Sequence, residues 1–416
     1  MQTRTAGRAV LTTLTTAAVT AAVTAATLTV PAAAATGGGD GRHAATRAAM
    51  EAQVTAGAVG VLGQARDGDG SWNASAGVAD LRTHRPRIAQ DHFRVGSISK
   101  AFTSVVLLQL EAEGKVGLDD SVERWLPGVV HGNGHDGSAV TIRQLLNHTS
   151  GIFNYTEDEG FISLLSKDFP EHRFDSFTPE ELVATAMKHA PSFKPGTDWH
   201  YSNTNYILAG MIVEKVSGNS YADEIERRIT GPLHLRHTSL PGTDPTVPGP
   251  HGRAYSKLTD PAPDAKIHDV TELNPSWGGA AGEIISTTGD LNTFYSALLG
   301  GKLLPERQQK ELLTTVSTGK QIPGGRYGLG VMAATLPCGT TIWMHGGGIH
   351  GSMSMASGTA DGRHTASFNF NDDWAGDSTP LLLAEYCGTD RPAPRSGVAA
   401  SPSDVTATLK ALAALR

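Results

Sequence analysis

The strongest constraint in this sequence is a serine and a lysine placed three residues apart at the start of an apolar segment. Ser97 and Lys100 precede residues 101–110, a run that is mostly apolar and has no charged residue. The pattern predicts a helix over 97–113 that stops at Gly114 and is buried in the core. Residues three apart lie on one face of a helix, so the two side chains can meet.

Ser97 is the candidate nucleophile and Lys100 is its candidate base. A serine hydroxyl is a weak nucleophile until a base removes its proton. A lysine, with an ordinary pKa of about 10.4, becomes that base only where its surroundings lower this pKa. The positive end of the helix dipole at Ser97 favours a neutral lysine and stabilises an oxyanion. Alone, the spacing is weak, because a capping serine and a surface lysine explain most such pairs.

Tyr201 and Asn203 form the second candidate element. They lie in a turn before a helix predicted over 203–216, so both side chains are free to point into a cleft. We expect Tyr201 and Lys100 to share one proton during acylation, and Asn203 to orient Lys100 and the substrate amide. A tyrosine that covers the core is the common alternative.

The third candidate element is His345-Gly346-Gly347, at the end of a predicted strand. The glycines let a substrate backbone lie along the strand edge. We expect His345 to supply positive or hydrogen-bonding character near the leaving group, although a lone histidine ending a strand is more often structural. The glycines of 346–351 also match G-x-G-x-x-G, but the segment runs from strand to strand, which argues against a nucleotide site. Asp372-Asp373 is predicted to be a solvated turn.

Strand patterns lie at both ends of the chain, with helical patterns between them. Strands are predicted over 59–66, 72–78, 327–336, 340–345, 352–358 and 365–370. Helices are predicted over 44–55, 97–113, 141–148, 179–189, 203–216, 220–229, 289–299 and 381–387. The order predicts an α/β fold of the α+β type: an antiparallel sheet built from both chain ends and flanked by helices. A helical lobe is inserted over roughly 97–290, with a cleft where it meets the sheet.

The N-terminal segment has the pattern of a secretory signal peptide. Arg4 and Arg8 precede an uncharged stretch rich in Ala and Thr, followed by the small-residue cleavage site Ala33-Ala34-Ala35. We predict a signal peptide over 1–35, a linker over 36–42, a hydrolase domain over 43–388 and a disordered tail over 389–416. The mature protein is then secreted, without stable membrane insertion. A membrane anchor is the alternative.

Charge and cysteine content limit the partners. A net charge of −7 argues against nucleic acid, which binds clustered cations. Cys338 and Cys387 are the two cysteines, and an isolated pair in an exported protein most often forms a disulfide. Two buried thiols are the alternative. No C-x-x-C spacing or His/Cys cluster supports a metal site, and no cofactor is predicted. The oligomeric state does not follow from the sequence.

Ser97-x-x-Lys100, Tyr201-x-Asn203 and His345-x-Gly347 together resemble the motifs of the serine D-alanyl-D-alanine carboxypeptidase and class C β-lactamase superfamily. The similarity is closest to secreted Streptomyces carboxypeptidase/transpeptidases and extends from about residue 43 to residue 387. The resemblance implies a β-lactamase/transpeptidase-like fold, an acyl-enzyme at Ser97 and an oxyanion held by the backbone amides of Ser97 and Gly348. It also implies that Thr156 and Trp277 line the cleft, and it matches the cysteine pair to a disulfide.

One departure from the family pattern bears on substrate choice. The carboxypeptidases hold the substrate carboxylate with an arginine after a Tyr-Gly-Leu-Gly strand and with threonines around the third-motif glycine. Here Val331-Met332-Ala333-Ala334 follows that strand, and Gly346 and Gly348 replace the threonines.

These features predict a secreted serine hydrolase that acts through a Ser97 acyl-enzyme, with D-alanyl-D-alanine carboxypeptidase-like activity on cell-wall peptides as the first hypothesis. An esterase or D-amino-acid amidase or D-aminopeptidase is the second, favoured by the missing arginine. A β-lactamase is third, and a non-catalytic module that binds penicillin or cell wall is last. The expected partner is a small peptide, ester or β-lactam substrate.

Overall fold

The computed structural model describes residues 41–388 and residue 407. The predicted signal peptide, nearly all of the predicted linker and nearly all of the predicted tail lie outside these residues. Among the helices of the described residues, none combines the length and apolar character needed to cross a bilayer.

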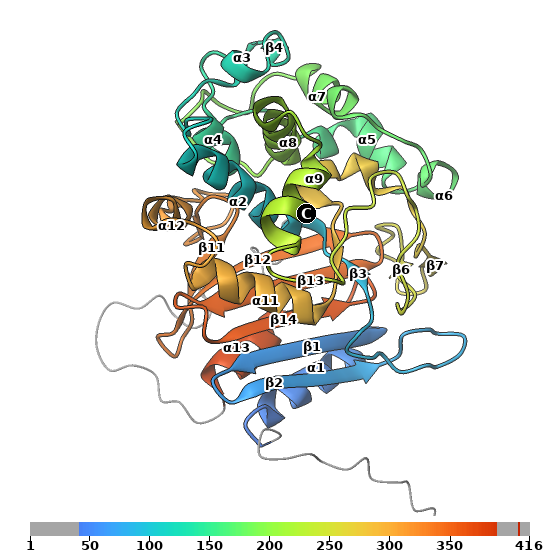
Figure 1. The fold of residues 1–416 in the computed structure, drawn as a ribbon. Helices are drawn as coiled ribbons and strands as arrows, with labels where there is room; N and C mark the ends of the chain where they lie inside the picture. Colours follow the sequence, from blue (N-terminus) through green and yellow to red (C-terminus); the bar gives the residue numbers. More distant parts are fainter. Residues whose placement is uncertain (1–40, 389–406, 408–416) are drawn as a thin grey trace, which may run out of the picture. The chain divides into compact units, whose positions relative to one another are not determined.

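An eight-stranded antiparallel sheet unites the two ends of the chain (Figure 1). Its strand order is β2-β1-β14-β13-β12-β11-β10-β9. The strands are β1 (Gly60–Asp67), β2 (Gly70–Gly77), β9 (Val316–Ser317), β10 (Arg326–Tyr327), β11 (Met332–Thr335), β12 (Thr341–Ile349), β13 (Ser352–Thr359) and β14 (Thr365–Phe370). Val61 of β1 lies opposite Phe370 of β14, so the first strand pairs with the last. The predicted sheet built from both chain ends is confirmed.

Helices cover both faces of this sheet (Figure 1). The helices α1 (Ala44–Thr55) and α13 (Thr379–Cys387) pack together on one face, and α11 (Thr288–Leu299) packs on the other. Adjacent strand residues point to opposite faces. Accordingly Val61 packs in the core with Met50 and Leu381, whereas its neighbour Leu62 packs in a separate core with Leu291.

Along the chain, the helical lobe is inserted between strand β2 and strand β9, the two groups of strands that form the sheet. At its centre α2 (Ser99–Ala112) packs against α8 (Asn203–Ser217), and α2 is almost wholly buried, as its uncharged sequence predicts. The other helices are α3 (Val122–Trp125), α4 (Ile142–Leu146), α5 (Glu159–Leu164), α6 (Phe169–His172), α7 (Pro179–Met187), α9 (Tyr221–Ile225), α10 (Gly279–Gly282) and α12 (Glu306–Leu313). Three two-stranded ribbons complete the fold: β3 (Phe93–Arg94) with β8 (Ile285–Ser286), β4 (His131–Gly132) with β5 (His135–Asp136), and β6 (Tyr255–Ser256) with β7 (His268–Asp269).

Two of the predicted strands differ from the structure by more than one or two residues at their boundaries. The segment 327–336 is two strands, β10 and β11, because the chain turns at Gly330, which has a φ of +81° that favours glycine. The strand predicted over 340–345 continues through the glycines to Ile349. The third motif therefore lies inside β12 rather than at its end.

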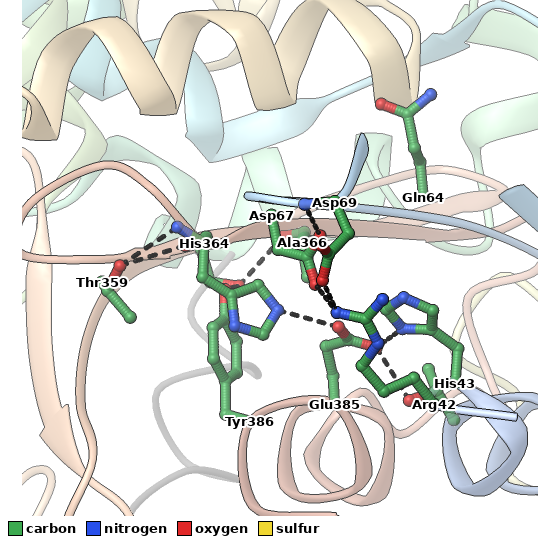
Figure 2. Close-up of polar contacts among 12 residues, drawn as sticks. Arg42, His43, Gln64, Asp67, Asp69, Thr359, His364, Ala366, Glu385 and Tyr386 are labelled. Carbon is green, nitrogen blue, oxygen red and sulfur yellow. Dashed lines mark hydrogen bonds and ion pairs between the residues drawn. The ribbon is translucent and has the colours of Figure 1, made fainter. Parts of the chain in front are cut away.

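A disulfide and a buried carboxylate both join the last helix, α13, to other parts of the domain. Cys338 and Cys387 form the predicted disulfide, which joins the β11–β12 turn to the end of α13. Glu385 of α13 pairs with His43 Nδ1 at 3.0 Å and with His364 Nε2 at 2.8 Å (Figure 2). We name Glu385, His43 and His364 the Glu385 cluster.

The carboxylate of this cluster stays charged although it is buried. Burial alone would raise the pKa of Glu385, but the hydrogen bonds from His364 and His43 outweigh it and lower the pKa to about 2. The hydrogen bond to Glu385 in turn raises the pKa of His43. Thr46 Oγ1 donates a further hydrogen bond to the carboxylate at 2.8 Å. A charged group thus links α1, α13 and the β13–β14 turn.

Candidate active site

Ser97 lies in a short 3-10 turn, Gly96–Ile98, that leads directly into α2. This turn is pressed against β12. A Cβ atom on Gly347 would lie 1.9 Å from the carbonyl oxygen of Val95 and 2.9 Å from the amide nitrogen of Ser97. Only glycine fits at such a distance, so the third-motif glycine permits close packing of β12 on the nucleophile turn. Ser97 and Gly348 both reach the same cavity.

Lys100 is fully buried one helical turn beyond the nucleophile. Its Nζ lies 2.9 Å from Ser97 Oγ, 2.7 Å from Asn203 Oδ1 and 2.9 Å from the carbonyl oxygen of Ala281. Within the described part of the chain no carboxylate pairs with it. Burial therefore lowers the pKa of Lys100 well below its ordinary value. A neutral amine in hydrogen-bonding contact with a serine hydroxyl is the arrangement that a general base requires.

Tyr201 packs beside the lysine, and its hydroxyl is buried. Lys100 Nζ lies over the ring of Tyr201, 4.8 Å from its centroid. Among the described residues the hydroxyl has no well-formed hydrogen-bond partner. Burial raises the pKa of Tyr201 above its ordinary value, and the nearby Ser97 hydroxyl offsets this only in part. The structure thus favours a neutral phenol over the proton-sharing phenolate expected from the sequence.

Asn203 connects the lysine to the substrate side of the site. It is the first residue of α8, and its backbone N–H donates to Asn154 Oδ1 at 3.0 Å. Its Oδ1 accepts from Lys100, while its Nδ2 donates to Thr156 Oγ1 at 3.3 Å. Thr156 and Asn203 both line the cavity. The structure therefore brings the first and second motifs together.

His345 lies behind the cavity wall rather than in it. It is fully buried, and its ring centroid is 6.4 Å from that of Tyr201. Burial, together with the nearby Lys100, lowers the pKa of His345 to about 3, so the imidazole is neutral. Of the positive or hydrogen-bonding character expected of it near the leaving group, the lowered pKa favours hydrogen bonding, and its ring nitrogens face the Gly346 carbonyl and the Tyr327 hydroxyl. Gly346 and Gly347 do not line the cavity either, and Gly348, the residue after the third motif, does.

A cavity of about 540 Å³ opens beside Ser97 and has a mainly apolar lining. Trp277 forms part of its wall, as the resemblance implied, and no arginine of the described residues lines it. Val331 and Met332, which stand where the carboxypeptidases carry their arginine, are buried outside it. The lining residues are Ser97, Tyr155, Thr156, Ile162, Leu165, Ser166, Asn203, Ser256, Lys257, Leu258, Thr259, Asp260, Pro261, Trp277, Gly278, Ala281, Gly282, Gly348, Ile349, His350, Asp373 and Trp374.

Several parts of the site had no signal in the sequence. The Ala281 carbonyl acts through its backbone, so its residue type does not reveal it. Tyr155 hydrogen-bonds through its hydroxyl to the carbonyl of Trp277 and so fixes one wall. The predicted solvated turn at 372–373 is wrong: Asp372 is buried and accepts from the Val59 N–H at 2.8 Å, while Asp373 lines the cavity. Among residues 41–388 no cluster of three His, Cys, Asp or Glu side chains could hold a metal ion.

Comparison with known proteins agrees with this geometry. The sequence profile of the family described as Beta-lactamase matches residues 43–409. Penicillin-binding protein 4* of Bacillus subtilis (strain 168) is 29% identical over 345 residues, which cover 79% of this chain and 71% of that protein. Two further curated relatives match this chain over 60% and 43% of their own lengths.

Two solved structures extend the comparison. The crystal structure of a D-stereospecific amidohydrolase from Streptomyces sp. has 54% sequence identity and a TM-score of 0.80, and covers 83% of this chain and 99% of that one. The D-amino acid amidase from Ochrobactrum anthropi SV3, complexed with L-phenylalanine, has 26% identity and a TM-score of 0.70, and covers 80% of this chain and 93% of that one.

Proposed function

The chain belongs to the beta-lactamase family of serine hydrolases, and we propose that within it the protein is a D-stereospecific amidohydrolase. In this proposal it hydrolyses amides or esters of D-amino acids through an acyl-enzyme at Ser97. The observation that carries the proposal is the cavity beside Ser97, whose lining has no arginine among the described residues. A bidentate arginine is the preferred clamp for a substrate carboxylate, and a neutral amide or ester needs none.

Lys100 acts as the base in the acylation step. A neutral amine has two N–H donors and one lone pair. The Asn203 amide oxygen and the Ala281 carbonyl can only accept, so they take the two donors, and the lone pair faces the Ser97 hydroxyl. Lys100 then removes the Ser97 proton as Oγ attacks the carbonyl carbon of the substrate. The backbone N–H groups of Ser97 and Gly348 receive the negative charge that develops on the carbonyl oxygen.

Tyr201 returns a proton to the leaving group. Collapse of the tetrahedral intermediate breaks the C–N bond, and the departing amine needs a proton. The neutral phenol of Tyr201 lies beside Ser97 and under Lys100, so it can donate its proton to the amine and recover one from Lys100. Water then attacks the acyl-enzyme by the same route in reverse, which releases the D-amino acid and restores Ser97.

The specificity is tested with four substrates and one variant. We expect D-phenylalanine amide to be hydrolysed at least about tenfold faster than its L enantiomer, since stereochemistry decides whether the carbonyl meets Ser97 in an attacking geometry. A D-alanyl-D-alanine peptide should react faster when its C-terminal carboxylate is amidated. Ser97→Ala should abolish all of these activities. Preference for the free carboxylate would overturn the proposal in favour of a carboxypeptidase.

Benzylpenicillin distinguishes the remaining alternatives. Intact mass and drug concentration are followed together after mixing with the protein. A lasting adduct mapped to Ser97 would support the nucleophile and place the protein with penicillin-binding enzymes. Rapid destruction of the drug, at a rate above that for D-phenylalanine amide, would instead make the protein a β-lactamase.

We also propose that the protein is secreted. The signal-peptide pattern of residues 1–35 supports export, and the Cys338–Cys387 disulfide is a bond that persists in oxidising compartments. N-terminal sequencing of the protein from culture medium should begin near residue 36. Recovery of the chain only inside the cell, with residues 1–35 still attached, would overturn the proposal.

A further inference from the structure

Behind the cavity wall, three buried side chains form a continuous line of hydrogen bonds. Tyr327 Oη lies 2.9 Å from His345 Nε2 and 3.2 Å from His148 Nε2. His148 Nδ1 receives the backbone N–H of Ser202 at 3.2 Å and lies 3.2 Å from Asn205 Nδ2. His345 Nδ1 lies 2.6 Å from the carbonyl oxygen of Gly346. We name His148, Tyr327 and His345 the buried relay.

With both imidazoles neutral, one arrangement of protons satisfies the buried relay. The Gly346 carbonyl can only accept, so His345 Nδ1 bears the hydrogen and its Nε2 accepts from the Tyr327 hydroxyl. The Ser202 amide can only donate, so His148 Nδ1 accepts and its Nε2 donates to Tyr327. Tyrosine can donate one hydrogen bond and accept another, which joins the two halves. Both imidazoles are neutral in this arrangement, with opposite tautomers.

The two ends of the buried relay reach the second and third motifs. At one end, His148 fixes the backbone after Tyr201 and packs against the Tyr201 ring, with centroids 4.4 Å apart. At the other end, His345 binds the carbonyl of Gly346, immediately before the glycines that pack on the nucleophile turn. The relay thus connects the residue that supplies a proton to the strand that carries the oxyanion amide.

The backbone at His148 gives an independent sign that this placement matters. His148 is fully buried and has a φ of +63°, a left-handed conformation that is unfavourable for a residue with a Cβ atom. The chain accepts this cost at a position that is neither glycine nor at the surface. Such strain persists where the surrounding contacts determine the geometry. Here those contacts are Tyr327, Ser202 and Asn205.

We propose that His148, Tyr327 and His345 are positioning residues. They hold Tyr201 and the Gly347–Gly348 segment of β12 in fixed positions relative to Ser97. The relay acts on acylation through geometry and takes no proton from the substrate. A buried polar line of this kind specifies one arrangement only when every member has a partner, as here. Loss of one member leaves a buried polar atom of its neighbour without its partner and lets Tyr201 and β12 move independently. The inference rests on the Ser97 acyl-enzyme of the proposed function, although not on its D-amide specificity.

The first test reads the tautomers directly. The protein is labelled with ¹⁵N-histidine, and the two resonances are assigned with His148→Gln and His345→Gln variants. The expected spectrum at pH 7 shows His345 with its hydrogen on Nδ1 and His148 with its hydrogen on Nε2. A protonated imidazole, or the opposite tautomer, at either residue would overturn the proposal.

The second test compares two tyrosine variants. Tyr327→Phe removes the central hydroxyl of the relay, and we expect the acylation burst with p-nitrophenyl acetate to slow by about a hundredfold. The KM should change by less than about threefold, because the cavity lining is untouched. Tyr386→Phe is the matched control: it removes another buried hydroxyl, bonded to Ser357 Oγ at 3.0 Å, that belongs to neither the cavity lining nor the buried relay.

The control variant should acylate within about twofold of the parent protein, even if its thermal stability falls as far as that of Tyr327→Phe. Equal slowing in both variants, or unchanged acylation in Tyr327→Phe, would overturn the proposal. Should Tyr327→Phe fail to fold, the tautomer measurement on the parent protein decides alone. Neither test uses a D-amino-acid substrate, so failure of the D-amide specificity would be seen separately in the amide assays.

Discussion

Lys100 and Glu385 are both buried ionisable side chains, but the protein favours the neutral form of Lys100 and the charged form of Glu385. Lys100 meets only neutral groups, the Ser97 hydroxyl and the oxygens of Asn203 and Ala281, so burial drives its pKa down. Glu385 meets two histidines, and their hydrogen bonds hold its pKa at about 2 despite burial (Figure 2).

The difference shows that burial alone does not set the charge of a group. Desolvation disfavours the charged form in both places. The partners then decide whether the group loses its charge or keeps it. At the active site the absence of a counter-ion yields a base. In the Glu385 cluster the presence of counter-ions yields a structural ion pair.

The largest expected effect is on the side of Lys100. Lys100→Arg introduces a guanidinium that stays charged when buried and cannot take the Ser97 proton. We expect the rate of the acylation burst with p-nitrophenyl acetate to fall by about a thousandfold or more. Lys115→Arg, the same change at an exposed lysine paired with Glu113, should leave the rate within about twofold. A Lys100→Arg protein that acylates within tenfold of the parent would show that a neutral amine is not required.

The second-largest expected effect is on the stability that the Glu385 cluster provides. Glu385→Gln removes the charge and leaves the two histidines without a counter-ion, which should lower the free energy of unfolding by about 2 kcal/mol. Activity per folded molecule should not change. His172→Gln, at an exposed pair with Asp175, should cost much less stability in the same urea titration, because solvent screens exposed pairs. Equal costs in the two variants would mean that the cluster is no stronger than a surface pair.

The smallest effect is the pH dependence of the same cluster. The raised pKa of His43 means that its contribution is complete below the unfolded value of 6.5 and is lost as pH rises through the folded value. The lowered pKa of Glu385 means that its contribution is present above 4.5 and is lost as pH falls toward about 2. Glu385→Gln should therefore destabilise the protein more at pH 5.5 than at pH 8.5. Urea unfolding at both values checks this, and an equal or reversed loss would contradict it.

The sequence predicted those parts of the fold that depend on local patterns. The strand patterns of β13 and β14 and the uncharged run of α2 were sufficient to place these elements, whereas β12 extends past its predicted end. The split between β10 and β11 was not predicted, because the turn at Gly330 interrupts a run that reads as one strand. Asp372 was misjudged for a different reason: its partner is the Val59 amide, and only the pairing of β1 with β14 brings the two together.

The same division holds for the active site. The sequence by itself determined that Ser97 and Lys100 meet, because a spacing of three residues fixes neighbours on any helix. Only the tertiary structure decided that burial lowers the pKa of both Lys100 and His345, and that His345 does not line the cavity. The acceptors of Lys100 lie 103 and 181 residues away in the chain, in Asn203 and Ala281. Burial and counter-ions are sums over such distant neighbours, which local spacing does not specify.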